Sequence, residues 1–161
     1  MEIALKGKHG NGKHCLVSNH DYERLKGIRL HMLRSGYVLL YDKLTKKNMY
    51  LHRYLFQEEL KANTKLVVDH INHCKSDCRR ENLRLITQQE NLCNRRKISF
   101  KTSSQYKGVC RTLNDKWVAL ITLHGKRFYI GTYNDERDAA IAYNLKAIEL
   151  HKGYALLNTI H

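Results

Sequence analysis

The chain has 161 residues, enough for one ordinary domain or for two or three small ones. Its 29 lysines and arginines exceed its 15 aspartates and glutamates, and the net charge of +14 favours a polyanionic partner such as DNA, RNA or an anionic membrane. No hydrophobic run is long enough to span a bilayer, and the N-terminal MEIALKGKHG does not have the pattern of a signal peptide, which argues against membrane attachment. Five cysteines without framework spacing predict a reduced, cytoplasmic chain.

Residues 1–65 open with a stretch rich in glycine, lysine and histidine that we expect to be loosely structured. Ser18 or Asn19 is a candidate N-cap for a short helix over DYERL. The runs GYVLLYD and NMYLHRYLF predict two strands, joined by the polar turn from Lys43 to Lys47. This segment therefore predicts a β-hairpin with a basic tip.

Residues 66–98 have the order strand, loop, strand, helix. The apolar run LVVDH predicts a strand that ends at Asp69 and His70, and NHCKSDCRREN is a polar loop before the short strand LRLI. Thr87 is followed three residues later by Glu90, the pattern of a capping box. We expect a helix from there through QQENLCNRRK.

Residues 99–104 are polar and are the predicted linker. Residues 105–161 then show a different pattern of predicted elements. YKGVCR, KWVALITL and KRFYIGTY predict three strands with turns at LND and HG. Asn134 or Asp135 then caps a long helix rich in alanine, which ends at Gly153. The chain as a whole is predicted to be α+β, with its last part a three-stranded antiparallel sheet packed on one helix.

Four polar residues of the middle segment form a candidate catalytic set. Asp69 and His70 are adjacent on a strand, so their side chains point to opposite faces unless the chain turns there. An Asp oxygen together with an amide oxygen from Asn91 suits Mg²⁺ or Mn²⁺, one ion per site, because these ions keep waters and bind phosphate oxygens. His70 can serve as general base, and Asn82 is expected to hold its ring through the other nitrogen.

The strings VVDHIN, ENLRLIT and QENLCN resemble the HNH endonuclease family, in particular its homing-endonuclease branch with the ββα-metal fold. His70 and Asn82 are twelve positions apart, and Asn82 and Asn91 are nine apart, as the motif requires. The resemblance implies that His70 activates water, that Asn82 orients it, and that Asp69 and Asn91 bind the metal. It implies hydrolysis of DNA phosphodiester bonds.

Three cysteines and a histidine raise the alternative of a structural zinc site. Cys74, Cys78, Cys93 and His73 could supply four ligands, but the spacing C-x₃-C with one distant cysteine lacks the second CxxC pair of typical zinc sites. We therefore expect no structural zinc. His52, in the second run of the predicted hairpin, is expected to pack or to contact phosphate.

Residues 105–158 resemble the APETALA2/ethylene-response-factor DNA-binding domain, through YKGV, KWVALI, GKRFYIGTY, AAIAYN and GYALLN. In that family the sheet lies in the major groove and the helix supports it from behind. The resemblance places six residues on or beside the sheet face that meets DNA: Lys107, Arg111, Lys126, Arg127, Tyr129 and Thr132. Trp117 is expected to be mainly in the core. Cys110 and Thr112 depart from the arginines common in the plant domains, so the plant base code does not carry over.

Further basic residues are candidates for contacts with the DNA backbone. The predicted hairpin carries Arg34, Lys43, Lys46, Lys47 and Arg53. A second group flanks the catalytic set in sequence and is expected to clamp phosphate near the cut: Arg79, Arg80, Arg84, Arg95 and Arg96.

The sequence thus predicts a metal-dependent, site-recognising endonuclease of the phage or mobile-element type, acting on double-stranded DNA in the cytoplasm of a bacterial host cell as a monomer or weak dimer. Its predicted domains are a supporting hairpin segment at 1–65, a nuclease core at 66–98, the linker, and a DNA-binding domain at 105–161. One alternative is a DNA-binding regulator with a degenerate, non-cutting HNH core. A second alternative is an RNA-binding, ribosome-associated protein.

Overall fold

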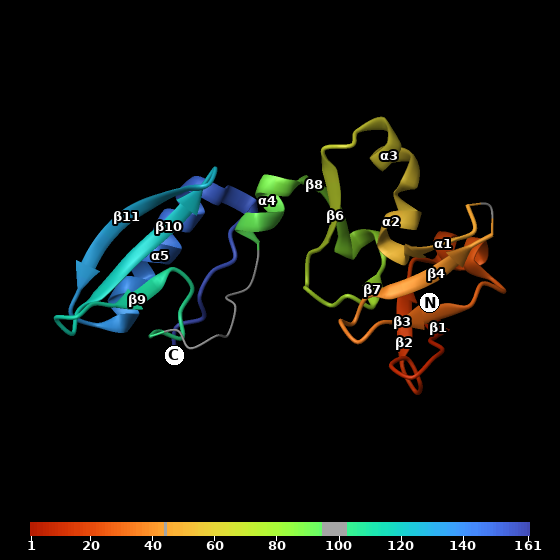
Figure 1. Cartoon of the computed structure of the whole chain (residues 1–161), viewed down its shortest axis with the longest axis horizontal. Coiled ribbons are helices and arrows are strands. Elements are labelled where there is room, and N and C mark those ends of the chain that lie inside the picture. Colours follow the sequence, from red (N-terminus) through yellow and green to blue (C-terminus); the bar gives the residue numbers. More distant parts are fainter. Residues whose placement is uncertain (44, 95–102) are drawn as a thin grey trace. The chain divides into compact units, whose positions relative to one another are not determined.

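The computed structural model describes residues 1–43, 45–94 and 103–161. The chain forms two compact units, Met1–Gln88 and Gln89–His161, each with its own core (Figure 1). Both units combine small sheets with helices, so the α+β class is confirmed. None of the helices in the described ranges is long and apolar enough to cross a membrane.

The beginning of the first unit is more ordered than its composition suggests. Strand β1 (Glu2–Ala4) pairs antiparallel with β2 (His14–Val17), and β2 also pairs in parallel with β7 (Asp77–Cys78). The Leu5 amide donates to the Lys13 carbonyl at 2.9 Å, which closes the intervening loop. The expectation of a loose N-terminus was therefore wrong for these strands, because alternate residues of β2 are buried in the core.

A second sheet contains the predicted hairpin. Its antiparallel order is β3 (Leu30–Met32), β4 (Val38–Asp42) and β5 (Lys47–Tyr50), preceded by helix α1 (Asn19–Leu25). The pairing of β4 with β5 confirms the hairpin. Its second strand, however, ends at Tyr50, after which the chain forms α2 (Leu51–Leu55) and α3 (Gln57–Ala62).

The helix α2 replaces a predicted strand for a simple reason. Leu51 and Leu55 are four residues apart and both are buried, which is the spacing of one helix face. The apolar run was too short for its periodicity to distinguish a strand from a helix.

The strand-loop-strand-helix order of the middle segment is confirmed as far as it is described. Strands β6 (Leu66–His70) and β8 (Leu83–Thr87) pair antiparallel, and α4 (Gln88–Cys93) follows directly. The short strand β7 and a 3₁₀ turn at Arg80–Asn82 lie in the connection. The rest of the expected helix and most of the expected linker lie outside the described residues.

The second unit has the sheet and helix that were predicted for residues 105–161. Strands β9 (Val109–Arg111), β10 (Trp117–Leu123) and β11 (Lys126–Tyr133) form an antiparallel sheet, and α5 (Glu136–His151) packs against it (Figure 1). Asp135 caps α5 by accepting a 2.6 Å hydrogen bond from the Arg137 amide. The alanines of α5 let it approach the sheet closely, and its buried face consists of Ala139, Ala140, Tyr143, Ala147 and His151.

Two details fix how the helix meets the sheet. Trp117 is partly buried against this core, as expected. Gly108 has a φ of +75°, and a Cβ placed there would lie 2.1 Å from the Tyr143 ring. The glycine of YKGV is therefore required both by its backbone conformation and by the space it leaves.

Candidate active site and DNA-binding face

The end of β6 presents Asp69 and His70 on opposite faces of a two-stranded ribbon. In the register of β6 and β8, Asp69 lies opposite Arg84 and His70 lies opposite Leu83. Side chains alternate along a strand, so the two catalytic candidates face different environments, as the sequence indicated. His70 is buried, with 5% of its surface exposed.

Asp69 is engaged by an arginine from the neighbouring strand. Arg84 Nε lies 3.0 Å and Nη2 lies 2.9 Å from Asp69 Oδ2. Arg84 was predicted to contact DNA phosphate. Instead it pairs across the ribbon with the predicted metal ligand, because the register brings the two side chains together.

Burial lowers the pKa of His70, against the opposing effect of the Asp69 and Asp77 carboxylates. A lowered pKa keeps the imidazole neutral at pH 7, which is the form that can accept a proton. Its Nε2 lies 3.8 Å from Cys78 Sγ. The environment of His70 therefore suits a general base.

Asn82 was expected from the sequence to hold the His70 ring, but both ends of its side-chain amide bind the loop instead. Its Oδ1 accepts a 3.0 Å hydrogen bond from the Asn72 amide, and its Nδ2 donates to the Asp77 carbonyl at 2.7 Å. Both ends of this buried side chain thus tie down the loop that follows His70. These two bonds satisfy the backbone amide of Asn72 and the backbone carbonyl of Asp77.

Two residues of the same loop were missed by the sequence analysis. Asn72 Nδ2 donates to Asp77 Oδ2 at 2.9 Å, and Arg79 donates to both Asp77 oxygens at 2.8 Å. These contacts lower the pKa of Asp77, with the Arg79 hydrogen bond as the largest cause. The Asn and Asp in HINHCKSD are common turn formers, and that was the available signal.

The arginines near the site mostly hold the fold together. Arg79 is bound to Asp77, and Arg80 donates to both oxygens of the fully buried Asp21, at 2.8 and 3.1 Å. Arg80 also donates to the Leu55 carbonyl at 2.8 Å. Both guanidinium groups are thus paired with buried carboxylates, and the phosphate clamp stays a prediction for these two side chains. Arg95 and Arg96 lie outside the described residues.

In the second unit, one face of the sheet is free of the helix and carries predicted DNA contacts. Arg127, Tyr129 and Thr132 lie opposite Thr122, Leu120 and Val118 of β10, which alternate with the residues that pack on α5. A bulge between Ala119 and Leu120 shifts the register, so Tyr129 and Thr132 share a face although they are three residues apart. The Tyr129 hydroxyl is 2.8 Å from Thr132 Oγ1.

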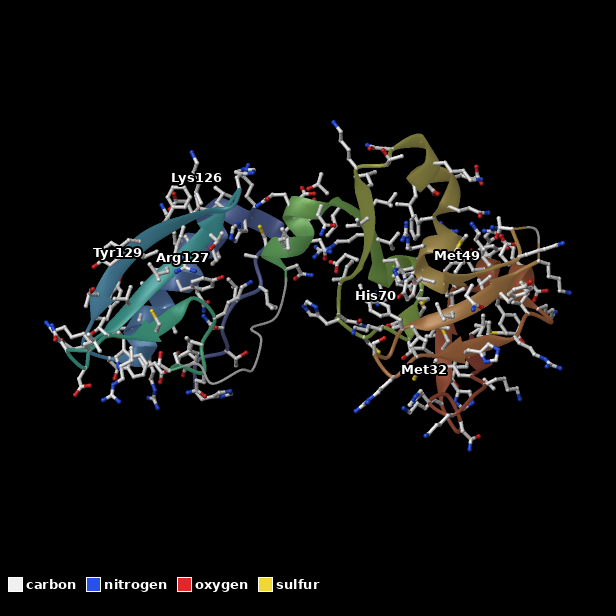
Figure 2. The ribbon with its side chains drawn as sticks, in the orientation of Figure 1. Met32, Met49, His70, Lys126, Arg127 and Tyr129 are labelled. Atoms are coloured by element: carbon white, nitrogen blue, oxygen red, sulfur yellow. The ribbon has the colours of Figure 1, made fainter. Side chains whose placement is uncertain are left out.

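Figure 2 shows Lys126, Arg127 and Tyr129 along β11. All three are exposed. The sheet thus offers two cations and one aromatic ring at its surface, a combination suited to phosphates and bases.

Lys107, Arg111 and Lys126 are placed differently from the other three. Lys126 pairs with Leu123, which is adjacent to Thr122 on β10 and therefore points to the other side of the sheet from the face of Arg127. Lys107 Nζ donates to the Cys93 carbonyl at 2.6 Å, and burial lowers its pKa. It is therefore not on the exposed sheet face. Arg111 remains exposed but pairs with Asp115 at 3.2 Å and lies over the Trp117 ring.

Comparison with known proteins identifies the first part of this arrangement. A family model described as HNH endonuclease matches residues 49–93, which include β6, β8, α4 and all four candidate catalytic residues. An uncharacterized HNH endonuclease of Acanthamoeba polyphaga mimivirus is 34% identical over 153 residues, covering 94% of this chain and 78% of the relative. The chain belongs to the HNH endonuclease family.

A second relative is of a different kind. The ethylene-responsive transcription factor WRI1 of Arabidopsis thaliana is 37% identical over 84 residues, covering 48% of this chain and only 20% of the plant protein. This partial match is a weak indication of an APETALA2-type segment in the HNH chain.

Nucleases of the HNH family typically use a divalent metal ion. Within the described ranges, no group of three or more His, Cys, Asp or Glu side chains is arranged to hold a metal. The proposed donors, a carboxylate from Asp69 and an amide from Asn91, are hard oxygen ligands of the type Mg²⁺ prefers. Asn91 lies on α4 in the second unit, and its assignment rests on the sequence resemblance.

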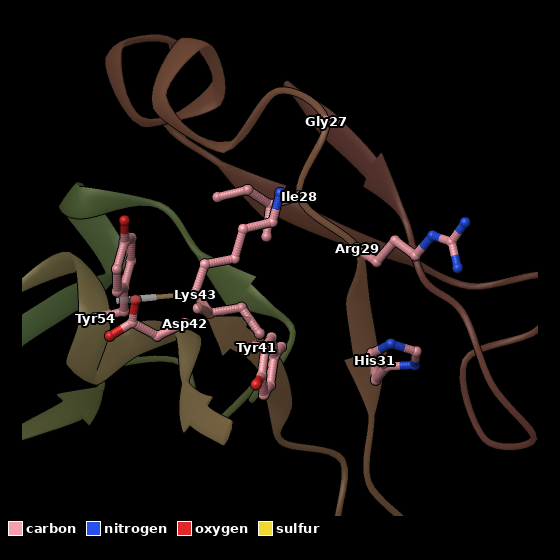
Figure 3. Close-up of a pocket in the computed structure, with 9 residues that line it drawn as sticks. Gly27, Ile28, Arg29, His31, Tyr41, Asp42, Lys43 and Tyr54 are labelled. Atoms are coloured by element: carbon pink, nitrogen blue, oxygen red, sulfur yellow. The ribbon is translucent and has the colours of Figure 1, made fainter. Parts of the chain in front are cut away.

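A pocket of about 480 Å³ opens on the first unit of this HNH protein (Figure 3). Its lining combines the aromatic rings of Tyr41 and Tyr54 with the basic side chains of Arg29 and Lys43. Lys43 belongs to the basic tip of the predicted hairpin. The lining also includes the carboxylate of Asp42, so the charge of this surface is mixed.

Proposed function

We propose that the protein is a metal-dependent endonuclease that recognises and cuts double-stranded DNA. The observation that carries the proposal is the end of β6, where a buried neutral histidine and a carboxylate lie on opposite faces within the segment matched to the HNH family. Two consecutive residues thus provide a proton acceptor, His70, and a metal ligand, Asp69, on separate faces.

His70 is the proposed general base. Burial lowers its pKa, so the imidazole is ready at neutral pH to take a proton from the water that attacks the phosphate. The clamped loop from Ile71 to Cys78 holds the chain rigid immediately after the histidine, through the Asn82 and Asp77 contacts. Rigid support of this kind keeps the base at a fixed distance from its substrate.

Asp69 and Asn91 are the proposed metal ligands. A Mg²⁺ or Mn²⁺ ion held by these oxygens would supply Lewis-acid stabilisation of negative charge on the phosphate. Arg84, which pairs with Asp69 Oδ2, holds that carboxylate in place.

The exposed sheet face of the second unit is the proposed grip on duplex DNA. Its residues, together with the net charge of +14, give a surface that attracts the backbone and reaches base edges. We further infer a homing or mobile-element type of enzyme that works in the cytoplasm of its host, as a monomer or weak dimer.

Strand cleavage of a supercoiled plasmid tests the proposal. The wild-type chain with Mg²⁺ or Mn²⁺ should convert supercoiled DNA to nicked or linear forms, and excess EDTA should stop the conversion. Product ends carrying a 5′ phosphate would agree with hydrolysis at the 3′ oxygen. Cleavage that is equally fast in EDTA would contradict a metal-dependent mechanism.

The second candidate is a DNA-binding regulator that does not cut. The ion pair between Arg84 and Asp69 favours it, because an arginine at the carboxylate competes with a metal ion for the same oxygen. This candidate predicts tight binding to duplex DNA without cleavage under any divalent metal. Tighter binding to structured RNA than to duplex DNA at equal salt would instead favour an RNA-binding protein.

A further inference from the structure

The ring of His52 lies directly against the ring of His70. Their centroids are 4.9 Å apart with an interplanar angle of 67°, an edge-to-face arrangement. Both side chains are buried, His52 with 7% and His70 with 5% of their surface exposed. The contact therefore occurs inside the first unit, away from bulk water.

His52 is itself held in place by its surroundings. It belongs to α2, whose Leu51 and Leu55 are anchored in the core of the first unit. The rings of Tyr37 and Tyr50 lie 5.4 and 5.6 Å from the His52 ring. His52 thus has little freedom to rotate away from its neighbour.

The aromatic rings around His52 also contact the loop that follows His70. Lys75 Nζ lies 4.4 Å from the Tyr37 ring centroid and donates to the Ser35 carbonyl at 2.8 Å. The Tyr37 ring also lies 6.2 Å from the His70 ring. The rings of Tyr37 and His52 therefore both lie against the His70 ring, and Tyr50 packs behind them on these two rings.

The contact that the structure shows between His52 and His70 is ring packing. The Nδ1 atom of His52 is buried and has no hydrogen-bond partner among the described residues. Edge-to-face packing, by contrast, depends on the shape and quadrupole of a planar ring. A ring of similar size without nitrogen atoms should therefore pack against His70 in the same way.

The His70 ring needs such support because its expected partner is occupied elsewhere. Both ends of the Asn82 amide bind the loop, and the contact of His70 Nε2 with Cys78 Sγ, at 3.8 Å, is a weak one. We propose that His52 is a positioning residue, whose ring fixes the orientation of the His70 imidazole for proton transfer. The inference rests on the proposed role of His70 as the base.

Single-turnover cleavage by full-length variants tests the proposal. His52→Ala removes the ring and should lower the cleavage rate constant by about tenfold or more, since small misplacements of catalytic groups can cost up to about 100-fold. His52→Phe restores a ring and should recover the rate to within about threefold of wild type, whereas His52→Leu restores bulk alone and should not. DNA affinity, measured separately without metal, should stay unchanged in all three.

His20→Ala serves as a matched control, because His20 is exposed on α1, and it should cleave at the wild-type rate. Thermal unfolding of every variant shows whether it folds. If His52→Ala is unfolded, the comparison of His52→Phe with His52→Leu decides the question.

A His52→Leu rate equal to wild type, or a His52→Phe rate as low as that of His52→Leu, would overturn the positioning role. A change in DNA affinity that accounts for the whole loss would also overturn it. His70→Ala is measured in parallel, because full cleavage by that variant would instead refute the role of His70 as base.

Discussion

At the scale of single residues, His70 lies against the ring of His52, and its neighbour Asp69 is paired with Arg84. A strand that ends at two adjacent polar residues predicts opposite faces, and the pairing with Arg84 and Leu83 agrees. The role of Asn82 could not be predicted in this way, because its partners belong to an irregular loop. The contact of His52 with His70 was equally hidden, since it depends on α2 being a helix.

The buried His52 should make the protein sensitive to mild acid. Burial, then the neighbouring charges of His70 and Arg53, lower its pKa from 6.5 to about 3. The unfolded chain takes up a proton below pH 6.5 while the folded chain does not, so the stability present above pH 6.5 falls as the pH falls toward 3. Because of this single group, the free energy of unfolding at pH 5 should be about 2 kcal/mol lower than at pH 8.

Chemical denaturation of wild type and His52→Phe at the two pH values measures this contribution. The Phe variant should lose about 2 kcal/mol less than wild type between pH 8 and pH 5. It should also be at least as stable at pH 8, because the unpaired Nδ1 is gone. An identical pH dependence in both proteins would show that His52 is not the responsible group.

At the scale of elements, the sequence was most informative where periodicity was long. The three strands of the second unit and α5 match their predicted positions, because alternation, turn residues and the Asp135 cap agree along the whole stretch. The short runs of the first unit were harder, and α2 was taken for a strand. The bulge in β10–β11, which places Thr132 beside Tyr129, lies next to Gly131, and a glycine inside a strand is a local signal that the sequence analysis did not use.

The exposed face of β11 leads to a prediction about binding. Arg127→Ala should weaken binding to duplex DNA and reduce the slope of log affinity against log salt by about 1 if the guanidinium contacts phosphate. Arg137→Ala removes the same charge from the exposed surface of α5 and is the control, which should change binding much less. Equal losses for the two variants, measured by fluorescence anisotropy across salt concentrations, would mean that only net charge matters.

At the scale of the whole molecule, the chain consists of two units with separate cores. The predicted boundary at 99–104 is close to the start of the second core, which Tyr106 begins. The helix α4, however, belongs to the second unit, and Lys107 holds its terminal Cys93 carbonyl. Such a contact between the end of one predicted segment and the start of another could not be read from either segment alone.

The separate core of the second unit predicts that residues 103–161 fold by themselves. The buried cluster of β9–β11 and α5 lies wholly within this range, as do the contacts of Ser103 and Ser104 that hold the loop before β9. The fragment should unfold cooperatively and bind duplex DNA without cutting it. A fragment without a cooperative thermal transition would show that α4 is needed for its stability.

If His70 is the base of a metal-dependent DNA nuclease, removing its imidazole should affect cleavage and not DNA binding. His70→Ala and the control His20→Ala are each assayed for plasmid cleavage with Mg²⁺ and for DNA affinity without it. His70→Ala should lose cleavage by about 100-fold or more while retaining its affinity, and the control should match wild type. Cleavage by His70→Ala at the wild-type rate, with folding and binding intact, would show that His70 is not the base.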